Sequence, residues 1–191
     1  MALTEIEFEL PAEQFALMGY PHLRQGQPLT LQLETVMLMP EPGGEGWFTV
    51  QPERLAAQFV QVGRARYAFA GQITQAELDQ EEGIESATLL VQCGDIPLRV
   101  VCGPREDGTL PFGTWETRYL AGSGRVLGIV EESFATGVGE QVGVTIWQFH
   151  RLSLTPGDPH FGQWHETVEL LPAPYQADRV IVTARLHRKA I

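Results

Sequence analysis

Strict alternation of apolar and polar residues begins almost at the start of the chain. Ile6, Phe8 and Leu10 alternate with glutamates, which is the two-residue period of a β-strand with one buried face. The same pattern and shorter apolar runs predict further strands, near 29–39, 47–50, 66–73, 86–93, 96–102, 114–120, 125–131, 142–154, 164–171 and 179–187. Many short strands of this kind favour a barrel or a sandwich.

Turn residues separate most of the predicted strands. Gly94-Asp95 lies between two apolar runs and predicts a two-residue hairpin loop. Other strands are bounded by Gly, Pro, Asp and Ser, at Asp107-Gly108, Gly122-Ser123-Gly124, Gly137–Gly139, 156–159 and 172–174. The turns therefore support an antiparallel arrangement.

Helix is predicted only in short pieces. Residues 12–18 could form one or two turns, and Pro52 could open another short helix. Thr74-Gln75-Ala76-Glu77 has the form of a capping box and predicts a short acidic helix or turn through Glu82. The sequence thus predicts a single all-β domain over 1–191, an antiparallel β-barrel or sandwich with one or two short helices.

Two similar blocks indicate an internally repeated β-unit. Phe112-Gly113-Thr114-Trp115-Glu116-Thr117 resembles 161–167, and their phenylalanines lie 49 positions apart. Strands and turns flank both blocks, which predicts pseudo-repeats near 27–75, 96–131 and 145–185. Trp115 and Trp164 would then be equivalent core residues, because large aromatic side chains dominate core packing. The alternative is that these two rings form a stacking surface for a ligand.

His150 and Gln148 are the most informative polar residues. With an unbroken two-residue period they share a face of strand 142–154 with aliphatic residues, Val144, Ile146, Leu152 and Leu154. Buried polar groups need partners, so we expect a buried, hydrogen-bonded His150 with Gln148 nearby. That face would hold either a satisfied polar network or a small-ligand pocket. In a third reading Trp147 and Phe149 face the core, and His150 is exposed.

Metal and cofactor chemistry find little support in the sequence. His150, His160 and His165 lie within 16 residues, with Asp158 and Glu166 beside them, but the spacing matches no metal motif. Neighbouring strand residues also point to opposite faces. We predict no catalytic residue, no metal ligand and no cofactor. The candidate ligand-binding residues are His150, Gln148, Trp115 and Trp164.

Net charge and cysteine spacing restrict the expected binding partners and the expected state of the thiols. The chain has 24 acidic and 13 basic residues and a net charge of −11, which disfavours nucleic acids and anionic membranes. An acidic cluster at Asp79, Glu81 and Glu82 could attract a cation or a basic partner. No long apolar stretch or basic leader is evident, so the default expectation is a soluble, cytoplasmic protein. The 94–95 hairpin separates Cys93 and Cys102, which predicts buried free thiols.

We therefore expect a non-catalytic binding or assembly module. Its partner would be a protein, or a second copy, paired through strand edges. The alternative is a small-ligand-binding β-barrel or an enzyme with a pocket around His150. A third, weaker possibility is single-stranded nucleic acid stacked on exposed aromatic rings, which the negative charge opposes.

Overall fold

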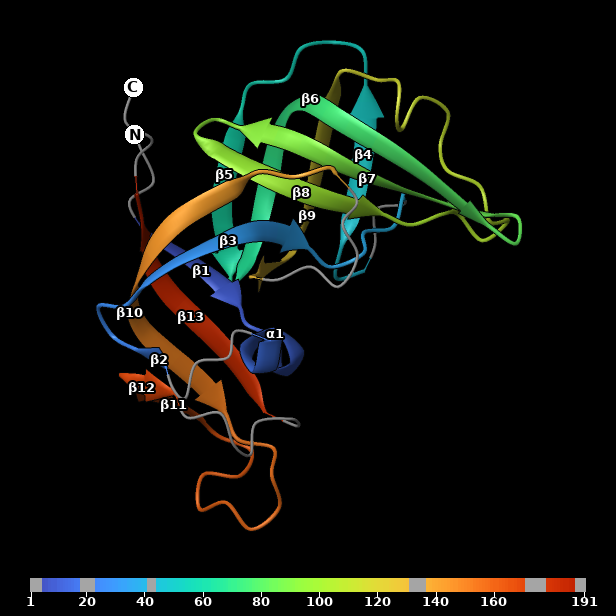
Figure 1. Ribbon diagram of the computed structural model, residues 1–191. Coiled ribbons are helices and arrows are strands. Elements are labelled where there is room, and N and C mark those ends of the chain that lie inside the picture. Colours follow the sequence, from blue (N-terminus) through green and yellow to red (C-terminus); the bar gives the residue numbers. More distant parts are fainter. Residues whose placement is uncertain (1–4, 18–22, 41–43, 131–136, 171–177, 188–191) are drawn as a thin grey trace.

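The computed structural model is nearly all β, with 61% strand and 3% helix, which confirms the predicted fold class. It describes residues 5–17, 23–40, 44–130, 137–170 and 178–187. Its elements (Figure 1) are β1 (Glu5–Glu9), α1 (Ala12–Leu17), β2 (Leu23–Arg24), β3 (Pro28–Thr35), β4 (Trp47–Gln51), β5 (Gln58–Gly63), β6 (Arg66–Glu81), β7 (Ile84–Cys93), β8 (Ile96–Cys102), β9 (Tyr119–Ile129), β10 (Gln141–Leu152), β11 (Trp164–Thr167), β12 (Glu169–Leu170) and β13 (Arg179–Leu186).

The main sheet closes on itself. Its strand order is β11-β10-β13-β1-β9-β3-β8-β7-β6-β5, and the pairings β10–β3 and β9–β6 complete a closed barrel of eight strands. β3 and β9 also pair with each other, so they divide the barrel into two smaller circuits. Figure 1 shows β4–β8 at one end and β10, β11, β13 and α1 at the other. β2 and β12 form a separate two-stranded sheet.

A continuous apolar core lies inside the barrel that this sheet forms. In β3, Leu29, Leu31 and Leu33 are buried while the residues between them are more exposed, as the alternation predicts. Phe8 of β1 and Phe149 of β10 are also buried in the same core. The alternating strands at the start of the chain therefore supply the inner face of the barrel.

A β-bulge in β10 changes the predicted face of His150. The register against β13 shifts between Ile146 and Gln148, which inserts one extra residue and moves the following side chains to the other face. Ile146 and then Phe149 are therefore buried in the core. The prediction that Gln148 and His150 share the face of the apolar residues Val144 and Ile146 is wrong for this reason.

The predicted turn at Gly122-Ser123-Gly124 is also wrong. These residues lie in the middle of β9, which replaces the two strands predicted at 114–120 and 125–131. A Cβ on Gly122 would lie 2.6 Å from the carbonyl oxygen of Trp47, and one on Gly124 would lie 2.5 Å from Leu38 Cδ2. Glycine is required here by the close approach of neighbouring groups.

One of the predicted helices is found. α1 lies within the predicted range 12–18, whereas the segment after Pro52 leads irregularly into β5. The Thr74–Glu77 capping box lies inside β6, where it pairs with β7. The many backbone hydrogen bonds of the β6–β7 hairpin stabilise the strand more than a four-residue capping box would stabilise a helix.

The structure does not confirm the internal repeat. Trp115 lies in a turn before β9, half-buried against the core, whereas Trp164 begins β11 and is 41% exposed. β8 and β9 flank β3, but β10 and β13 pair directly. The two blocks share a local turn, since Gly113 and Gly162 both have positive φ.

The Gly94-Asp95 hairpin is confirmed in its predicted register. Cys93 lies opposite Ile96, and Cys102 lies opposite Ala87. Both cysteines are free and buried.

Candidate functional site

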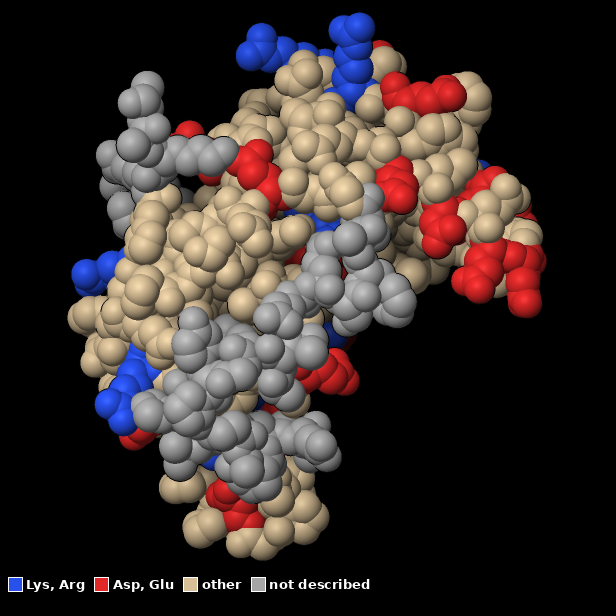
Figure 2. All heavy atoms as spheres, viewed as in Figure 1, with Lys and Arg blue, Asp and Glu red and all other residues tan. Residues whose placement is uncertain are grey.

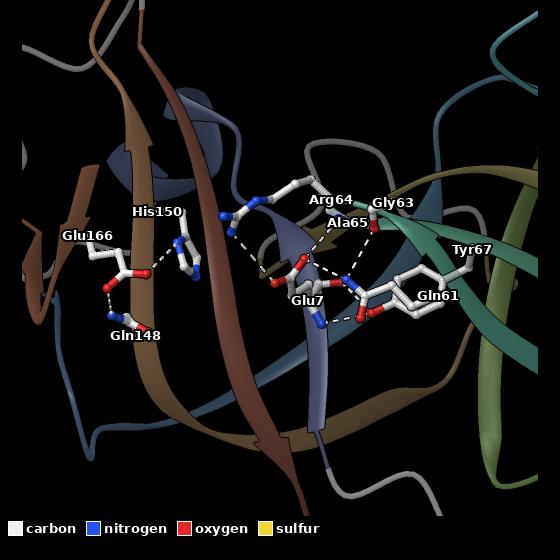
Figure 3. Close-up of polar contacts among 9 residues, drawn as sticks. All are labelled: Glu7, Gln61, Gly63, Arg64, Ala65, Tyr67, Gln148, His150 and Glu166. Carbon is white, nitrogen blue, oxygen red and sulfur yellow. Dashed lines mark hydrogen bonds and ion pairs between the residues drawn. The ribbon is translucent and has the colours of Figure 1, made fainter. Parts of the chain in front are cut away.

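Two of the predicted site residues, His150 and Gln148, both contact Glu166, which was not among the predicted ligand-binding residues. In the β10–β11 ladder His150 lies opposite Glu166, and His150 Nδ1 is 3.8 Å from Glu166 Oε1. Gln148 Nε2 donates a hydrogen bond to Glu166 Oε2 at 2.8 Å (Figure 3). His150 is 7% exposed, so its predicted burial is confirmed.

A second polar cluster surrounds Glu7 of β1. Its carboxylate accepts hydrogen bonds from Gln61 Nε2 at 2.7 Å and from the Ala65 backbone N–H at 3.2 Å. Arg64 Nη1 lies 3.8 Å from the same carboxylate. The Tyr67 hydroxyl accepts from the Glu7 N–H at 2.8 Å and donates to the Glu7 carbonyl at 3.1 Å (Figure 3). The cluster fixes the β5–β6 turn against β1.

Sequence reasoning missed the Glu7 cluster. In the sequence Glu7 is one of three glutamates on the polar face of an alternating strand, and its partners lie more than fifty residues further along the chain. One local signal stands out only in the structure. Ala65 is fully buried with a φ of 49°, a conformation that costs a non-glycine residue energy.

The electrostatic environment keeps His150 neutral. Burial lowers the pKa of His150 below its usual value, the positive charge of Arg64 lowers it further, and Glu7 and Glu166 act in the opposite sense. Burial raises the pKa of Tyr67 to about 12. Both groups are therefore uncharged near neutral pH, and both are enclosed by protein.

Trp164 lies on the same face of β11 as Glu166, because the two are separated by one residue. The Arg179 guanidinium lies over its ring, 5.8 Å from the centroid. Arg179 also donates from Nε and Nη2 to the Glu9 carboxylate at 3.1 Å each. Trp164 thus joins the face that carries His150, beside an ion pair.

Trp115 belongs to a different part of the molecule. The turn that contains it borders a hollow of about 650 Å³, lined by Val50, Pro52, Phe112, Gly113, Glu116, Thr117 and Arg118. Phe112 is 93% exposed at this site. The structure therefore brings together His150, Gln148 and Trp164 but not Trp115, and ligand binding by these four residues stays a prediction.

The predicted acidic cluster lies on a long hairpin. We refer to residues 75–86, the outer part of β6 and β7, as the arm. The arm contains five acidic residues and no basic one, and every residue from 75 to 81 is exposed. Figure 2 shows acidic side chains gathered over its outer end. The arm is therefore a strongly acidic element that projects from the barrel.

The predicted histidine group does not assemble as a metal site. The rings of His160 and His165 stack with centroids 4.7 Å apart, while His150 faces Glu166. Within the described ranges, no group of three or more His, Cys, Asp or Glu residues could hold a metal ion. In the same part of the chain, no helix is long and apolar enough to cross a membrane.

Comparisons of the chain with protein-family models, with curated proteins and with solved structures gave no match.

Proposed function

We propose that this protein is a non-catalytic module that binds a protein partner through open strand edges. The observation that carries the proposal is the contrast between a closed barrel and the strand edges that it leaves open, above all those of β5 and of the outer part of β6. β5 is the last strand of the order and pairs only with β6 among the described strands. Within the described part of the chain, the outer part of β6 pairs only with β7.

The open edges have acidic side chains on the arm and a register shift in each of β5 and β6, which limit unspecific pairing, but no described strand covers them. Natural proteins commonly shorten, cover or twist such edges, because unpaired backbone groups recruit other strands. β5 exposes Val60 by 50% and Val62 by 56%. β6 is 16 residues long and projects beyond the barrel. Both features favour use of the edges for binding.

The polar residues that first suggested a pocket support the same proposal. Gln148 and His150 are engaged with Glu166, and Tyr67 is engaged with the backbone of Glu7. The hydrogen bonds of Gln148 and Tyr67 hold strands together, and His150 lies within ion-pair distance of Glu166. Chemistry for recognition is therefore left to the exposed edges and the arm.

Site-specific photo-crosslinking in the source cell tests the proposal. A benzophenone amino acid would replace Val60 or Leu78 at the edges, with replacement of exposed Asp95 in the β7–β8 turn as the control. We expect discrete protein adducts from one or both edge positions and none of the same mass from Asp95. Identical adduct patterns at all three positions, or no edge adduct, would contradict the proposal.

The hollow beside Trp115 supports a second candidate function, small-ligand binding. Its volume of about 650 Å³ falls within the range of roughly 300–1,000 Å³ that is usual for ligand sites. A thermal-shift screen would identify a ligand, because binding to the native state alone raises the melting temperature. The shift should disappear in Phe112→Ser. A shift that persists in this variant would place the ligand elsewhere.

A further inference from the structure

We propose that the outer edge of β6, residues 76–81, takes up an extended basic segment of a partner protein as an additional β-strand. The inference rests on the proposed function, and it specifies which strand edge binds the partner and which kind of segment binds there. Three observations carry it: a vacant strand position, the phase of the backbone groups along it, and the spacing of its charges.

The vacant position continues the line of β9. β9 pairs with β6 from Arg66 to Gln72, and the last backbone contact on that side is from the Ile73 N–H to the Arg118 carbonyl at 2.8 Å. Beyond Ile73, no described residue pairs its backbone with this side of β6. The ladder to β7 nevertheless continues on the other side as far as Glu81. β6 is therefore held in strand geometry while one edge stays open.

The hairpin turn determines which backbone groups face outward. Glu82 and Gly83 form a two-residue turn with φ values of 51° and 81°, so the flanking pair Glu81 and Ile84 exchanges both hydrogen bonds. Alternate residues then bond to β7, and the N–H and C=O groups of Ala76, Leu78 and Gln80 point to the open side.

β7 provides an independent check of this phase. Glu85 lies opposite Gln80, and its N–H points away from β6 to the Gly108 carbonyl at 2.8 Å. In a non-hydrogen-bonded pair, the backbone N–H and C=O groups of both residues point away from the partner strand. Because those of Glu85 point away from β6, those of Gln80 must point away from β7, to the open side. Three residues of β6 therefore offer a regular set of donors and acceptors to a new strand.

The charges on β6 indicate what that strand carries. Glu77, Asp79 and Glu81 stand on one face at every second position, about 7 Å apart. Side chains directly opposite in an added strand would lie roughly 4.5–5.5 Å away between Cβ atoms, and opposite charges there are favourable. Leu78, 42% exposed, lies on the other face. The fitting segment alternates Lys or Arg with apolar or small residues.

Charge also excludes a second copy of the arm as the occupant. Two arms paired edge to edge would set acidic residues opposite acidic residues, which is destabilising. The net charge of −11 adds long-range repulsion between copies. A basic segment is attracted both by the acidic residues directly opposite it and, over longer distances, by the negative net charge of the protein.

Fluorescence anisotropy with a seven-residue peptide tests the inference. The labelled peptide alternates lysine with valine and threonine, and its control has the same residues with the lysines adjacent. At low ionic strength, where surface charges are little screened, we expect the alternating peptide to bind about tenfold more tightly than its control. Equal binding of the two peptides would overturn the proposal.

Leu78→Pro tests the role of the backbone. Proline removes an outward N–H but no hydrogen bond to β7, and it is tolerated on strand edges. We expect at least about tenfold weaker binding for Leu78→Pro and less than about threefold change for Leu78→Ala. Equal binding by these two variants would exclude strand addition at this edge.

A matched pair of triple variants tests the charges and separates this inference from the proposed function. Glu77→Gln, Asp79→Asn and Glu81→Gln together should weaken peptide binding about tenfold. The control, Glu5→Gln, Glu53→Gln and Glu106→Gln, has the same change in net charge and should bind as the wild type does. Equal weakening by both sets would show general attraction only. Photo-adducts at Val60 without any β6 dependence would keep the proposed function and overturn the β6 inference.

Discussion

At the scale of single residues, some buried polar groups are held by several partners from neighbouring strands and loops. Asp178 shows this clearly: its side chain is fully buried, and it accepts hydrogen bonds from Arg151 Nε at 2.6 Å and from the Leu154 N–H at 2.7 Å. Burial raises the pKa of Asp178, but these hydrogen bonds outweigh it and hold the pKa below its usual value. Such groups are costly to bury unpaired.

His150 should make the stability of the protein depend on pH. Its pKa is lowered in the folded state by burial and by Arg64, so the unfolded chain takes up the proton first. Stability should fall as pH drops through about 6.5, the unfolded value. Urea unfolding at a series of pH values near neutrality and below should show a smaller loss for His150→Gln than for the wild type. If the stabilities of the wild type and of His150→Gln change in parallel with pH, Glu7 and Glu166 fully offset the effect of burial on the pKa of His150.

Gly71 should tolerate no side chain. A Cβ at this position would overlap the carbonyl oxygen of Gln92, which is backbone and cannot move aside cheaply. We expect Gly71→Ala to lower the free energy of unfolding by about 1–3 kcal/mol, measured by chemical denaturation. Gly63→Ala is the matched control, because its nearest neighbour would be an ordinary contact at 3.6 Å. An equal loss in both variants would point to an effect other than overlap.

At the scale of elements, irregular features decide which side chains face inward. The bulge in β10 moves His150 off the face of Ile146, and a second register shift lies between Ile73 and Gln75 in β6, where the arm begins. Bulges bend a strand and increase its twist. One extra residue in each strand therefore reorients a whole half of the element.

Replacement of Glu82 should strengthen the arm. Glu82 has a φ of 51°, which disfavours most side chains, whereas Asn-Gly is the preferred pair in this type of turn. We expect Glu82→Asn to stabilise the hairpin by about 0.5–1 kcal/mol and to slow amide hydrogen exchange in residues 84–88. Glu81→Asn, which removes the same charge at ordinary backbone angles, should not slow exchange. Slower exchange in both variants would identify charge repulsion as the cause.

At the scale of the whole molecule, the two thiols report on opening of the barrel. Cys93 and Cys102 are 3% and 0% exposed, and burial raises the pKa of both thiols, that of Cys93 to about 12. Labelling by a disulfide reagent should be at least about 100-fold slower in the native protein than in denaturant. Fast native labelling would show that the β7–β8 hairpin opens locally. An unreduced mass two hydrogens light would reveal a disulfide.

The sequence determined the local structure where the two-residue period is unbroken. β1, β3 and the β7–β8 hairpin follow directly from alternation and from the Gly94-Asp95 turn. These features depend on neighbours within a few residues, so the pattern contains the information. The burial of His150 was predicted correctly, but its face was not, because the bulge moves it away from the face of Ile146.

Only the tertiary structure decided the closure of the barrel, the identity of the candidate site and the open edge of β6. Glu7 meets Tyr67 across 60 positions, and the glycines of β9 serve close approach in place of a turn. A strand pattern shows which face is buried, but it does not identify the neighbouring strand or where an extra residue shifts the register. Those choices depend on long-range packing, which one strand's own residues do not encode.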